Sequence, residues 1–325
     1  MFEQSSLLDF HYNMVIHLFL IVAAASSTNG LTLFPNLHPR ETVTTPGLTK
    51  SGFTAIFLDT FTGTVGTLPS SSNWLFDLGT SYPGGPAKWG NAESEIYTNA
   101  STNIQITRQN TLTITPRLSR GVWTSARIET VRSDFAAAAG SQLYVEARIK
   151  LGNAAASQQQ GIWPAFWALG SSFRGNYTNW PAASEWDFLE AVNGGSTMYS
   201  TIHCGVAPGG PCNEYNGIGS GGVAFSRGAF HTVGFLVDRS MCGAGSTSTW
   251  VNETLNWYLD GTKVFTVSGQ QVGDEKTWTA LAHNGHFLLL NVAVGGNWPG
   301  APNSKTIDGL TVAMEIDYVG VWKPT

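Results

Sequence analysis

From Gly52 onward, apolar and polar residues alternate with a period of two, and this constrains the fold more than any other feature of the chain. In 143–151 (LYVEARIKL) every second residue is apolar, which is the pattern of a strand with one buried face. The segment 314–322 alternates likewise, whereas 286–294 (HFLLLNVAV) is nearly all apolar and is expected to lie centrally in a sheet. Helical periodicity is confined to 274–282, with Asp274 as the expected N-cap.

Turn signals separate the expected strands. The pair Asp260-Gly261 lies between 255–259 and 262–267 and predicts a hairpin with a two-residue turn. Glycine is frequent, at 37 of 325 residues, and no internal repeat is visible. Many strands, glycine-rich loops and few helices predict an all-β sandwich of two sheets. We expect residues 53–325 to form this domain.

The N-terminal region predicts export. Residues 15–25 (VIHLFLIVAAA) form an apolar run that is too short to span a bilayer comfortably, and small residues follow at once, as a signal-peptidase site requires. Residues 1–13 contain no Lys or Arg, which is wrong for a signal peptide. We therefore expect translation to start at Met14, with 1–27 as a signal region. A buried strand or a short membrane anchor is the alternative.

Other features agree with a secreted, extracellular protein, which is compatible with association with a cell wall. Sequons for N-glycosylation occur at Asn99, Asn176 and Asn252. Residues 28–52 are rich in Thr, Pro and Gly and are predicted to form a flexible spacer. No second apolar span follows, so we expect no membrane residence after removal of the signal. We also expect a monomer.

Charge and cysteine content exclude other classes. The net charge is −5 and no Lys/Arg run occurs, so nothing would neutralise a nucleic-acid backbone. The spacing of Cys204, Cys212 and Cys242 does not fit a zinc site. The short segment between Cys204 and Cys212 allows a disulfide, but pairs with Cys242 remain open and one thiol is left over.

The segment 184–190 (SEWDFLE) concentrates acidic residues. Three of the 22 acidic residues fall within six positions. On a regular strand Glu185 and Asp187 share one face, and Leu189 would come next on it. A one-residue bulge around 188–189 is therefore predicted, because it returns Glu190 to the acidic face.

A solvated strand face is the alternative explanation of these acids. Against it, the opposite face carries Trp186 and Phe188 and is expected to pack on a core. Like charges at this spacing also repel each other, which a purely structural strand would avoid. Crowding raises at least one pKa and so gives a proton donor beside an ionised nucleophile, the pair that glycoside hydrolysis uses.

With this motif the chain resembles glycoside hydrolase family 16, in its laminarinase-type branch. The family motif Glu-X-Asp-X-X-Glu stands here as EWDFLE, and the resemblance covers about residues 53–325. The other matching segments follow in order: WGNAESEIYT (89–98), WTSARIET (123–130), VEARIKL (145–151), GIWPAFWALG (161–170), STIH (200–203), FHTVGF (230–235), WYLDG (257–261), LNVAVGGNWPG (290–300) and EIDYVGVW (315–322).

The resemblance implies a concanavalin A-like β-jelly roll with a sugar cleft on its concave face. It implies Glu185 as nucleophile, Glu190 as general acid/base and Asp187 as an electrostatic helper between them. Matching positions suggest that Asn91 and Arg127 hold sugar hydroxyls.

The resemblance also places His203 near the acid/base, with a satisfied structural histidine as the alternative. It suggests no required cofactor and no catalytic metal. A structural calcium ion occurs in the family, with Asp317 as one candidate ligand here.

Four tryptophans are expected at the cleft. Trp163 and Trp167 lie four residues apart on one strand face, where they stack on sugar rings or else fill a core. Trp180 and Trp298 stand beside prolines in loops and are expected at the cleft edge.

The motif departs from the family pattern at two positions. Ser184 precedes it in place of the usual glycine, and Trp186 replaces a small aliphatic residue. We expect Trp186 to point into the core, which changes the packing and leaves the chemistry intact.

Three functions fit these features. The first is a secreted, retaining endo-hydrolase of β-1,3-glucan, with mixed β-1,3/1,4-glucan as a further substrate. The second is a cell-wall β-glucan transglycosylase, which would use the same residues. The third is a glucan-binding lectin, and the two glutamates argue against it because such proteins dispense with the acids.

Overall fold

The computed structural model describes residues 48–241 and 250–325. The predicted signal region 1–27, the start at Met14, residues 28–47 of the spacer and Cys242 lie outside the described residues. The domain boundaries predicted from the sequence therefore stay a prediction.

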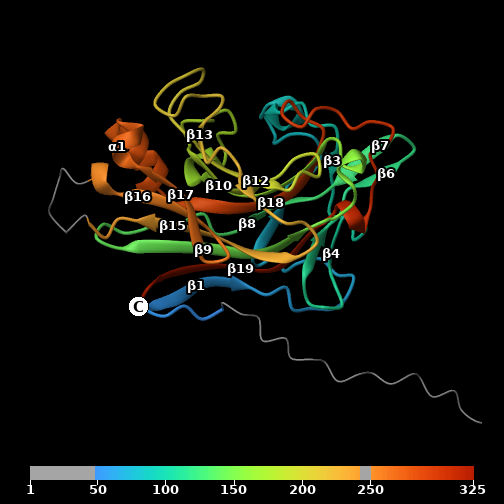
Figure 1. Cartoon of the computed structure of the whole chain (residues 1–325), viewed down its shortest axis with the longest axis horizontal. Helices are drawn as coiled ribbons and strands as arrows, with labels where there is room; N and C mark the ends of the chain where they lie inside the picture. Colours follow the sequence, from blue (N-terminus) through green and yellow to red (C-terminus); the bar gives the residue numbers. More distant parts are fainter. Residues whose placement is uncertain (1–47, 242–249) are drawn as a thin grey trace, which may run out of the picture. The chain divides into compact units, whose positions relative to one another are not determined.

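Two antiparallel sheets are stacked face to face (Figure 1). The first, here called the β9 sheet, consists of β1 (Phe53–Asp59), β4 (Ile104–Ile106), β5 (Leu112–Ile114), β9 (Gln142–Leu151), β15 (Phe230–Asp238), β16 (Thr254–Leu259), β17 (Thr262–Ser268) and β19 (Met314–Pro324). Its strand order is β17-β16-β15-β9-β19-β5-β4, and β1 also pairs with β19.

The second sheet, here called the β11 sheet, consists of β2 (Trp74–Phe76), β8 (Arg127–Thr130), β10 (Ile162–Gly170), β11 (Glu185–Glu190), β12 (Thr197–His203), β13 (Ile218–Gly219), β14 (Val223–Ala224) and β18 (His286–Val294). Its order is β13-β12-β11-β10-β18-β8-β2, with β14 beside β12. These two sheets confirm the predicted all-β sandwich and its β-jelly-roll class.

Smaller elements complete the described part. A three-stranded ribbon joins β3 (Ile96–Tyr97), β6 (Arg117–Ser119) and β7 (Val122–Ser125). The helices are α1 (Gly269–Val272), α2 (Glu275–Trp278) and a π-helical turn (Thr279–His283), and short 3-10 segments occur at Ala87–Gly90, Ala156–Gln158, Ser171–Phe173, Trp250–Asn252 and Leu310–Val312. The predicted helix and its cap are confirmed, because the Asp274 side chain accepts from the Thr277 N–H.

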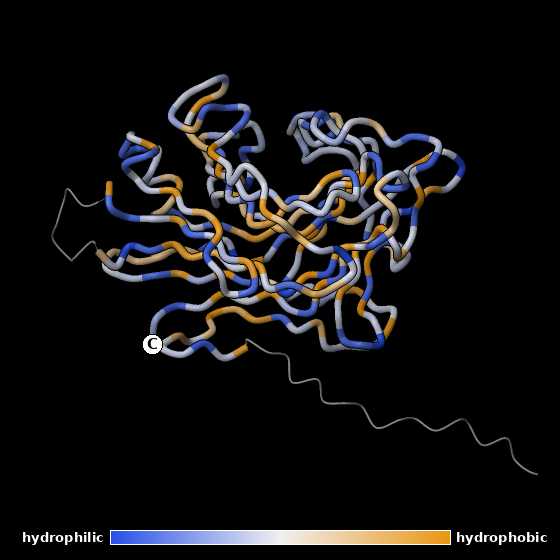
Figure 2. The backbone as a smooth tube through the Cα atoms, in the orientation of Figure 1, coloured by the Kyte–Doolittle hydropathy of each residue, from blue (hydrophilic) through white to orange (hydrophobic). Residues whose placement is uncertain are grey.

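The two types of strand pattern have different burial, as the sequence predicts. In β9 the apolar residues are buried, while Gln142, Tyr144, Arg148 and Lys150 are half-buried. Glu146 is the exception on the polar face, because Lys50, Tyr144 and Tyr318 all donate hydrogen bonds to its carboxylate. In β18 all nine residues are buried. Figure 2 shows apolar residues spread along the strands of both layers.

Strand β18 lacks alternation because both of its faces are covered. Leu288, Leu290, Val292 and Val294 belong to the main core between the sheets. Phe287 and Leu289 belong to a second apolar cluster on the other face of the β11 sheet, with Tyr82, Leu169, Phe173 and Ala183. This second cluster fills one end of that face.

The predicted hairpin is confirmed. Strands β16 and β17 pair across the two residues Asp260 and Gly261. Both have positive φ, 49° and 78°, as a two-residue turn that follows the strand twist requires. Glycine, which has no Cβ, adopts a positive φ at the second position without steric strain.

The folded unit begins before residue 53. The Nζ atom of Lys50 lies 2.8 Å from a Glu146 oxygen and also packs over the rings of Tyr144 and Trp322. Lys50, near the end of the predicted spacer, therefore contacts the β9 sheet.

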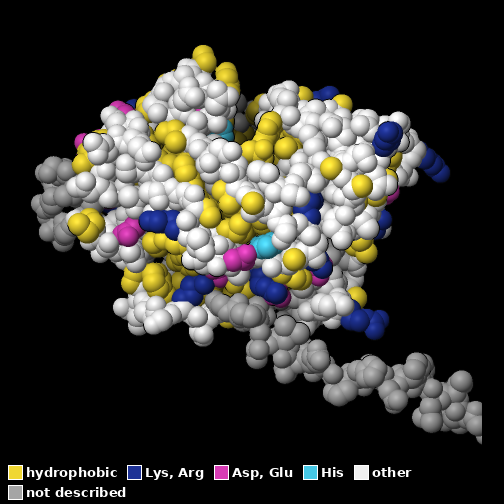
Figure 3. All heavy atoms as spheres, viewed as in Figure 1, with side chains coloured by type: hydrophobic (Ala, Val, Ile, Leu, Met, Phe, Trp, Pro, Cys, Tyr) yellow, Lys and Arg dark blue, Asp and Glu magenta, His cyan; other side chains and the backbone are white. Residues whose placement is uncertain are grey.

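The surface of the described residues is sparsely charged. Figure 3 shows charged side chains of both signs scattered over one face between larger uncharged areas. Among residues 48–241 and 250–325, no helix has the length and apolar character needed to cross a bilayer.

Candidate active site

Strand β11 has the bulge that the sequence predicts. Opposite β12, Asp187 pairs with Thr201 and Glu190 pairs with Tyr199. Two residues of β11, at 188 and 189, therefore lie against a single residue of β12. Trp186 and both bulge residues are fully buried, so the apolar face of the strand packs on the core as expected.

The bulge brings three carboxyl groups to one hollow on the face of the β11 sheet. The hollow is lined by Glu185, Asp187 and Glu190 of β11, by Trp163, Ala165 and Trp167 of β10, by Asn291 and Ala293 of β18, by Arg127 of β8, and by Asn91 and Glu93. Seven of the ten residues predicted for the site thus share one hollow. The other three, Trp180, His203 and Trp298, contact its lining.

An indole N–H reaches each of the two glutamates. Trp163 Nε1 donates to Glu190 over 3.0 Å, and Trp180 Nε1 donates to Glu185 over 2.9 Å. Each indole binds one oxygen of its carboxyl group. A different tryptophan therefore orients each glutamate.

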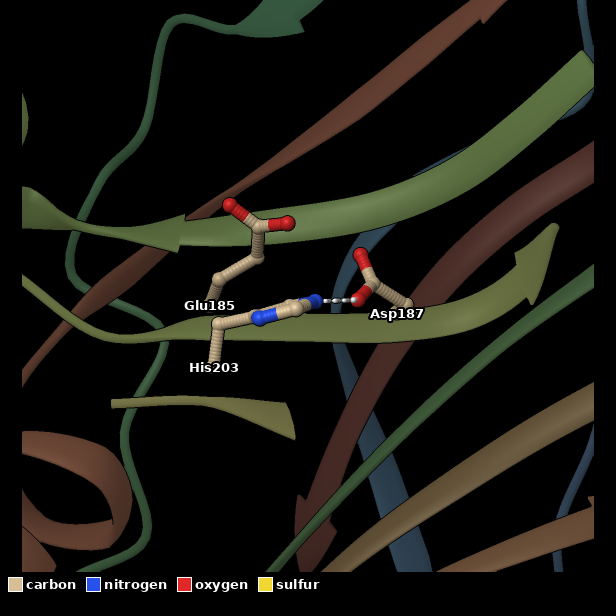
Figure 4. Close-up of side chains that lie close together, drawn as sticks. All are labelled: Glu185, Asp187 and His203. Atoms are coloured by element: carbon tan, nitrogen blue, oxygen red, sulfur yellow. Dashed lines mark ion pairs between the residues drawn. The ribbon is translucent and has the colours of Figure 1, made fainter. Parts of the chain in front are cut away.

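His203 of β12 lies directly across from Glu185 in the strand register. Its Nε2 atom is 3.6 Å from Asp187 Oδ2. Figure 4 shows the His203 ring pointing toward the Asp187 carboxyl group. Glu185, Asp187 and His203 each offer one donor atom, all within 4.8 Å of one another. Because an imidazolium already supplies positive charge there, we assign no metal to this group, and the expectation of no catalytic metal stays a prediction.

The two glutamates titrate differently. Burial, and then the charge of Glu185, raise the pKa of Glu190 to about 7. Burial also raises the pKa of Glu185, but the charge of His203 and the hydrogen bond from Trp180 oppose this rise. The surroundings therefore favour Glu190 as the protonated partner and Glu185 as the ionised one.

Asp187 lies between the two glutamates and feels the charge of both. Burial, followed by the charges of Glu185 and Glu190, raises its pKa well above the ordinary value. A protonated Asp187 donates to Glu185, and this hydrogen bond lowers the pKa of Glu185. Asp187 Oδ2 is buried and has no hydrogen-bond partner within the described ranges.

Arg127 and Asn91 line the hollow beyond β11. The guanidinium of Arg127 donates to Asp77 over 2.9 Å and to the Tyr82 hydroxyl over 3.1 Å, and only 4% of the residue is exposed. Asn91 is exposed and donates to Glu93 over 3.2 Å. Their proposed contacts with sugar hydroxyls stay predictions.

Tryptophans surround the hollow on two sides. Trp167 Nε1 donates to Asn291 over 2.8 Å. Trp298 is 45% exposed, and its ring meets the ring of Trp163 edge-on, with centroids 5.6 Å apart. Trp180 stacks on Tyr215, which is 67% exposed. Flat apolar faces are therefore available on both sides of the carboxyl row.

Four residues at the site were not predicted. Asn291 is the one polar side chain between His286 and the end of the apolar strand, which is a signal that the sequence does contain. Glu93 stands inside the quoted segment 89–98. Glu214 and Tyr215 lie in a loop without periodicity, and no sequence pattern points to them.

The loop that carries Glu214 is closed by a disulfide between Cys204 and Cys212. This settles one of the pairings that the sequence left open. Both cysteines are fully buried.

Asp317 does not fit a calcium site. Its carboxylate accepts from Arg148 Nη1 over 2.6 Å, and the neighbouring Glu315 is paired with Lys150. Calcium needs several oxygen ligands, and here basic side chains already neutralise the acids of β19. We therefore derive nothing from a bound calcium ion.

A larger hollow of about 550 Å³ lies on the β9 sheet. It is lined mainly by amide and hydroxyl side chains, by Leu310 and by the Lys150–Glu315 pair. It has no row of carboxyl groups, so we place the candidate chemistry at the smaller hollow on β11.

The chain resembles solved structures over most of its length. An endo-1,3-β-glucanase from Streptomyces sioyaensis is 41% identical, covers 86% of this chain and 99% of its own, and superposes with a TM-score of 0.80. The chain belongs to the laminarinase-type endo-1,3-β-glucanases of glycoside hydrolase family 16. The catalytic domain of the laminarinase from Thermotoga petrophila RKU-1 is 26% identical, over 84% of this chain and 98% of that one, with a TM-score of 0.64.

The curated relatives that this laminarinase-type chain matches first are longer. The glucan endo-1,3-beta-glucosidase A1 of Niallia circulans is 28% identical over 84% of this chain, which spans 38% of that relative. The chain spans about a third of the length of the curated relatives it matches first. No family model matches the chain.

We predict that Trp163→Phe raises the pKa of Glu190 above 7. The Trp163 hydrogen bond stabilises the ionised carboxylate, so its loss favours the protonated form. Carboxyl ¹³C NMR of labelled glutamate measures the midpoint. Trp167→Phe is the matched control, because it removes an indole bond to Asn291 on the same strand face. An unchanged Glu190 midpoint in Trp163→Phe contradicts the assigned role of this hydrogen bond.

Proposed function

We propose that this protein is a retaining endo-hydrolase of β-1,3-glucan. One observation carries the proposal: the bulge in β11 brings Glu185 and Glu190 to the same hollow, where the charge of Glu185 raises the pKa of Glu190 while the charge of His203 opposes the rise at Glu185. Family membership supports the substrate class. Mixed β-1,3/1,4-glucan is a further candidate substrate.

The proposed reaction has two displacements. Protonated Glu190 gives its proton to the glycosidic oxygen while Glu185 attacks the anomeric carbon, so the C–O bond to the leaving sugar breaks as a covalent ester to Glu185 forms. Glu190, now ionised, takes a proton from water. The oxygen of that water then displaces Glu185 and restores both carboxyl groups.

Asp187 is proposed to assist the nucleophile. As a protonated neighbour it stabilises ionised Glu185 by a hydrogen bond without adding a negative charge. Trp163, Trp180 and Trp298 are proposed to stack on sugar rings on either side of the scissile bond, because each belongs to the hollow or contacts its lining.

A transglycosylase would use the same first displacement and pass the sugar to another sugar. A glucan-binding lectin has no use for a carboxyl pair with separated protonation states, so the site favours an enzyme. We propose a monomer that needs no cofactor.

We predict that laminarin is cut internally. Early digestion should give a ladder of short oligosaccharides, because a hollow open on the sheet face accepts mid-chain sugars. Chromatography of products from laminarin, barley glucan, agarose and xyloglucan measures this. Glucose as the sole early product, or no product from any β-glucan, contradicts endo-hydrolysis, and oligosaccharides longer than the substrate identify transglycosylation.

We predict that azide separates the two glutamates. Glu185→Ala should lose about 10⁴-fold or more in kcat and be rescued by azide as an α-glycosyl azide, because azide enters the vacated nucleophile position. Glu190→Ala should keep turnover of substrates with good leaving groups and give the β-azide. Asp187→Asn should lower kcat and leave the fold intact. NMR of the azide products identifies the anomer that each variant forms. The same anomer from both variants contradicts the assignment of Glu185 as nucleophile and Glu190 as acid/base.

We also propose secretion as a glycoprotein, supported by the apolar run at 15–25. The three sequon asparagines, Asn99, Asn176 and Asn252, are exposed. Expressed in a fungal host, the protein should be found in the medium, begin near residue 26 and shrink on endoglycosidase treatment. Full-length, unglycosylated protein inside the cells contradicts this proposal.

A further inference from the structure

We propose that Glu214 is a positioning residue that keeps His203 protonated opposite the carboxyl groups of β11. The inference rests on the proposed hydrolysis, since it concerns the electrostatics of the same site. Glu214 itself is not part of the lining of the hollow and acts through His203.

The contacts of Glu214 fix its carboxylate on both oxygens. Oε2 lies 2.8 Å from His203 Nδ1, and Oε1 accepts from the backbone N–H of Cys204 over 2.7 Å. The Glu214 side chain has no exposed surface, while that of His203 is 15% exposed. A carboxylate buried in this way needs a positive partner, and the imidazolium of His203 is the one that it contacts.

The loop holds Glu214 in place before any substrate arrives. Its backbone forms a two-way bridge with Gly209, in which Glu214 N donates to Gly209 O and Gly209 N donates to Glu214 O. The Cys204–Cys212 disulfide closes the segment 204–212, which contains Gly209, and Glu214 follows this segment by two residues. The backbone of Glu214 is therefore held by hydrogen bonds to a cross-linked segment, and these bonds do not depend on His203.

The charge of His203 matters because of what faces it. Glu185, Asp187 and Glu190 face it from β11, and Glu214 faces it from the loop after β12. Burial alone lowers the pKa of His203, but the hydrogen bond that its ring donates to Glu214 and the charges of the neighbouring glutamates raise it to about 9. The resulting cation lowers the pKa of both Glu185 and Glu190.

A purely structural role of Glu214 and an electrostatic role predict different results for the same substitution. Under either role, replacement of Glu214 lowers the stability of the protein. Only the electrostatic role predicts that the titration midpoint of His203 moves with the charge at position 214.

The first experiment needs no substrate. In ¹⁵N-labelled wild-type protein, histidine NMR should give a titration midpoint for His203 above pH 8, with the signal assigned by its loss in His203→Gln. In Glu214→Gln, which keeps the shape of the side chain, the midpoint should fall by about one unit or more. A wild-type midpoint below 7 overturns the proposal even if no variant folds.

The second experiment follows kcat/KM on laminarin against pH. His203→Gln removes the imidazolium, so Glu185 should ionise at higher pH and the acidic limb should move up by about 0.5–1 unit. In Glu214→Gln the imidazolium is still present at the pH of this limb, and the lost charge of Glu214 no longer raises the pKa of Glu185, so the acidic limb should not move up. Glu214→Asp keeps the charge and should restore the wild-type His203 midpoint.

A matched control removes a carboxylate elsewhere. Glu315→Gln breaks the pair with Lys150 on the β9 sheet and should leave the His203 midpoint and the acidic limb unchanged. Equal loss of activity at every pH in Glu214→Gln, with an unmoved His203 midpoint, overturns the inference. Absence of turnover in the wild type with a His203 midpoint above 8 would contradict the proposed hydrolysis and leave the inference about Glu214 standing.

Discussion

The rest of the site depends on one constraint: three carboxyl groups lie side by side along a strand that is packed into a sandwich. Each charge that is removed from water raises the free energy of the folded state, and neighbouring negative charges add to that cost. The structure meets the constraint by raised pKa values and by hydrogen-bond donors. Burial and the neighbouring charges raise the pKa of Asp187 well above its ordinary value, and indole N–H groups reach Glu185 and Glu190.

His203 lies across from Glu185, at one end of the row of carboxyl groups. Its imidazolium is the largest of the effects that lower the pKa of Glu185 against burial. At Glu190 the largest charge effect is instead repulsion from Glu185. Burial raises the pKa of both glutamates, but the first charge effect is attraction to an imidazolium at Glu185 and repulsion from a carboxylate at Glu190, a difference that suits a pair of nucleophile and acid.

Much of the fold could be predicted from the sequence, because its signals are local. Alternation in 143–151 and its absence in 286–294 give the half-buried and the central strand. The bulge also follows from counting, since the third acid of EWDFLE reaches the face of the first two only if one residue is extra. The family motif then assigns the roles that spacing alone leaves open.

The parts that could not be predicted depend on contacts between distant segments. Glu214 meets His203 only because β12 and the loop after it fold back on each other, and the disulfide that closes this loop was one of several open pairings. The ion pair that Asp317 makes could not be predicted for the same reason. Its partner Arg148 comes from β9, 169 positions away in the sequence.

The two departures from the family motif are linked through one segment. Ser184 adopts a φ of 72°, a left-handed conformation that glycine reaches freely and that costs other residues about 1–2 kcal/mol. Its hydroxyl lies 3.1 Å from Ala280 O and 2.8 Å from His286 Nε2. Two residues on, the indole of Trp186 donates to Leu281 O and stacks on the same His286 ring, with centroids 3.4 Å apart.

Both acceptor carbonyls belong to the π-helical turn Thr279–His283. The last carbonyls of a short helical segment have no partner within it, so they are available to side chains that pack against the end. Burial lowers the pKa of His286 to about 3, which keeps its ring neutral between Ser184 and Trp186. A glycine at 184 would lack the hydroxyl, and a small aliphatic residue at 186 would leave Leu281 O without this donor and His286 without its stacked ring. The serine and the tryptophan thus replace the usual residues together, and they anchor the start of β11, from which Glu185 projects, to the end of a helical turn.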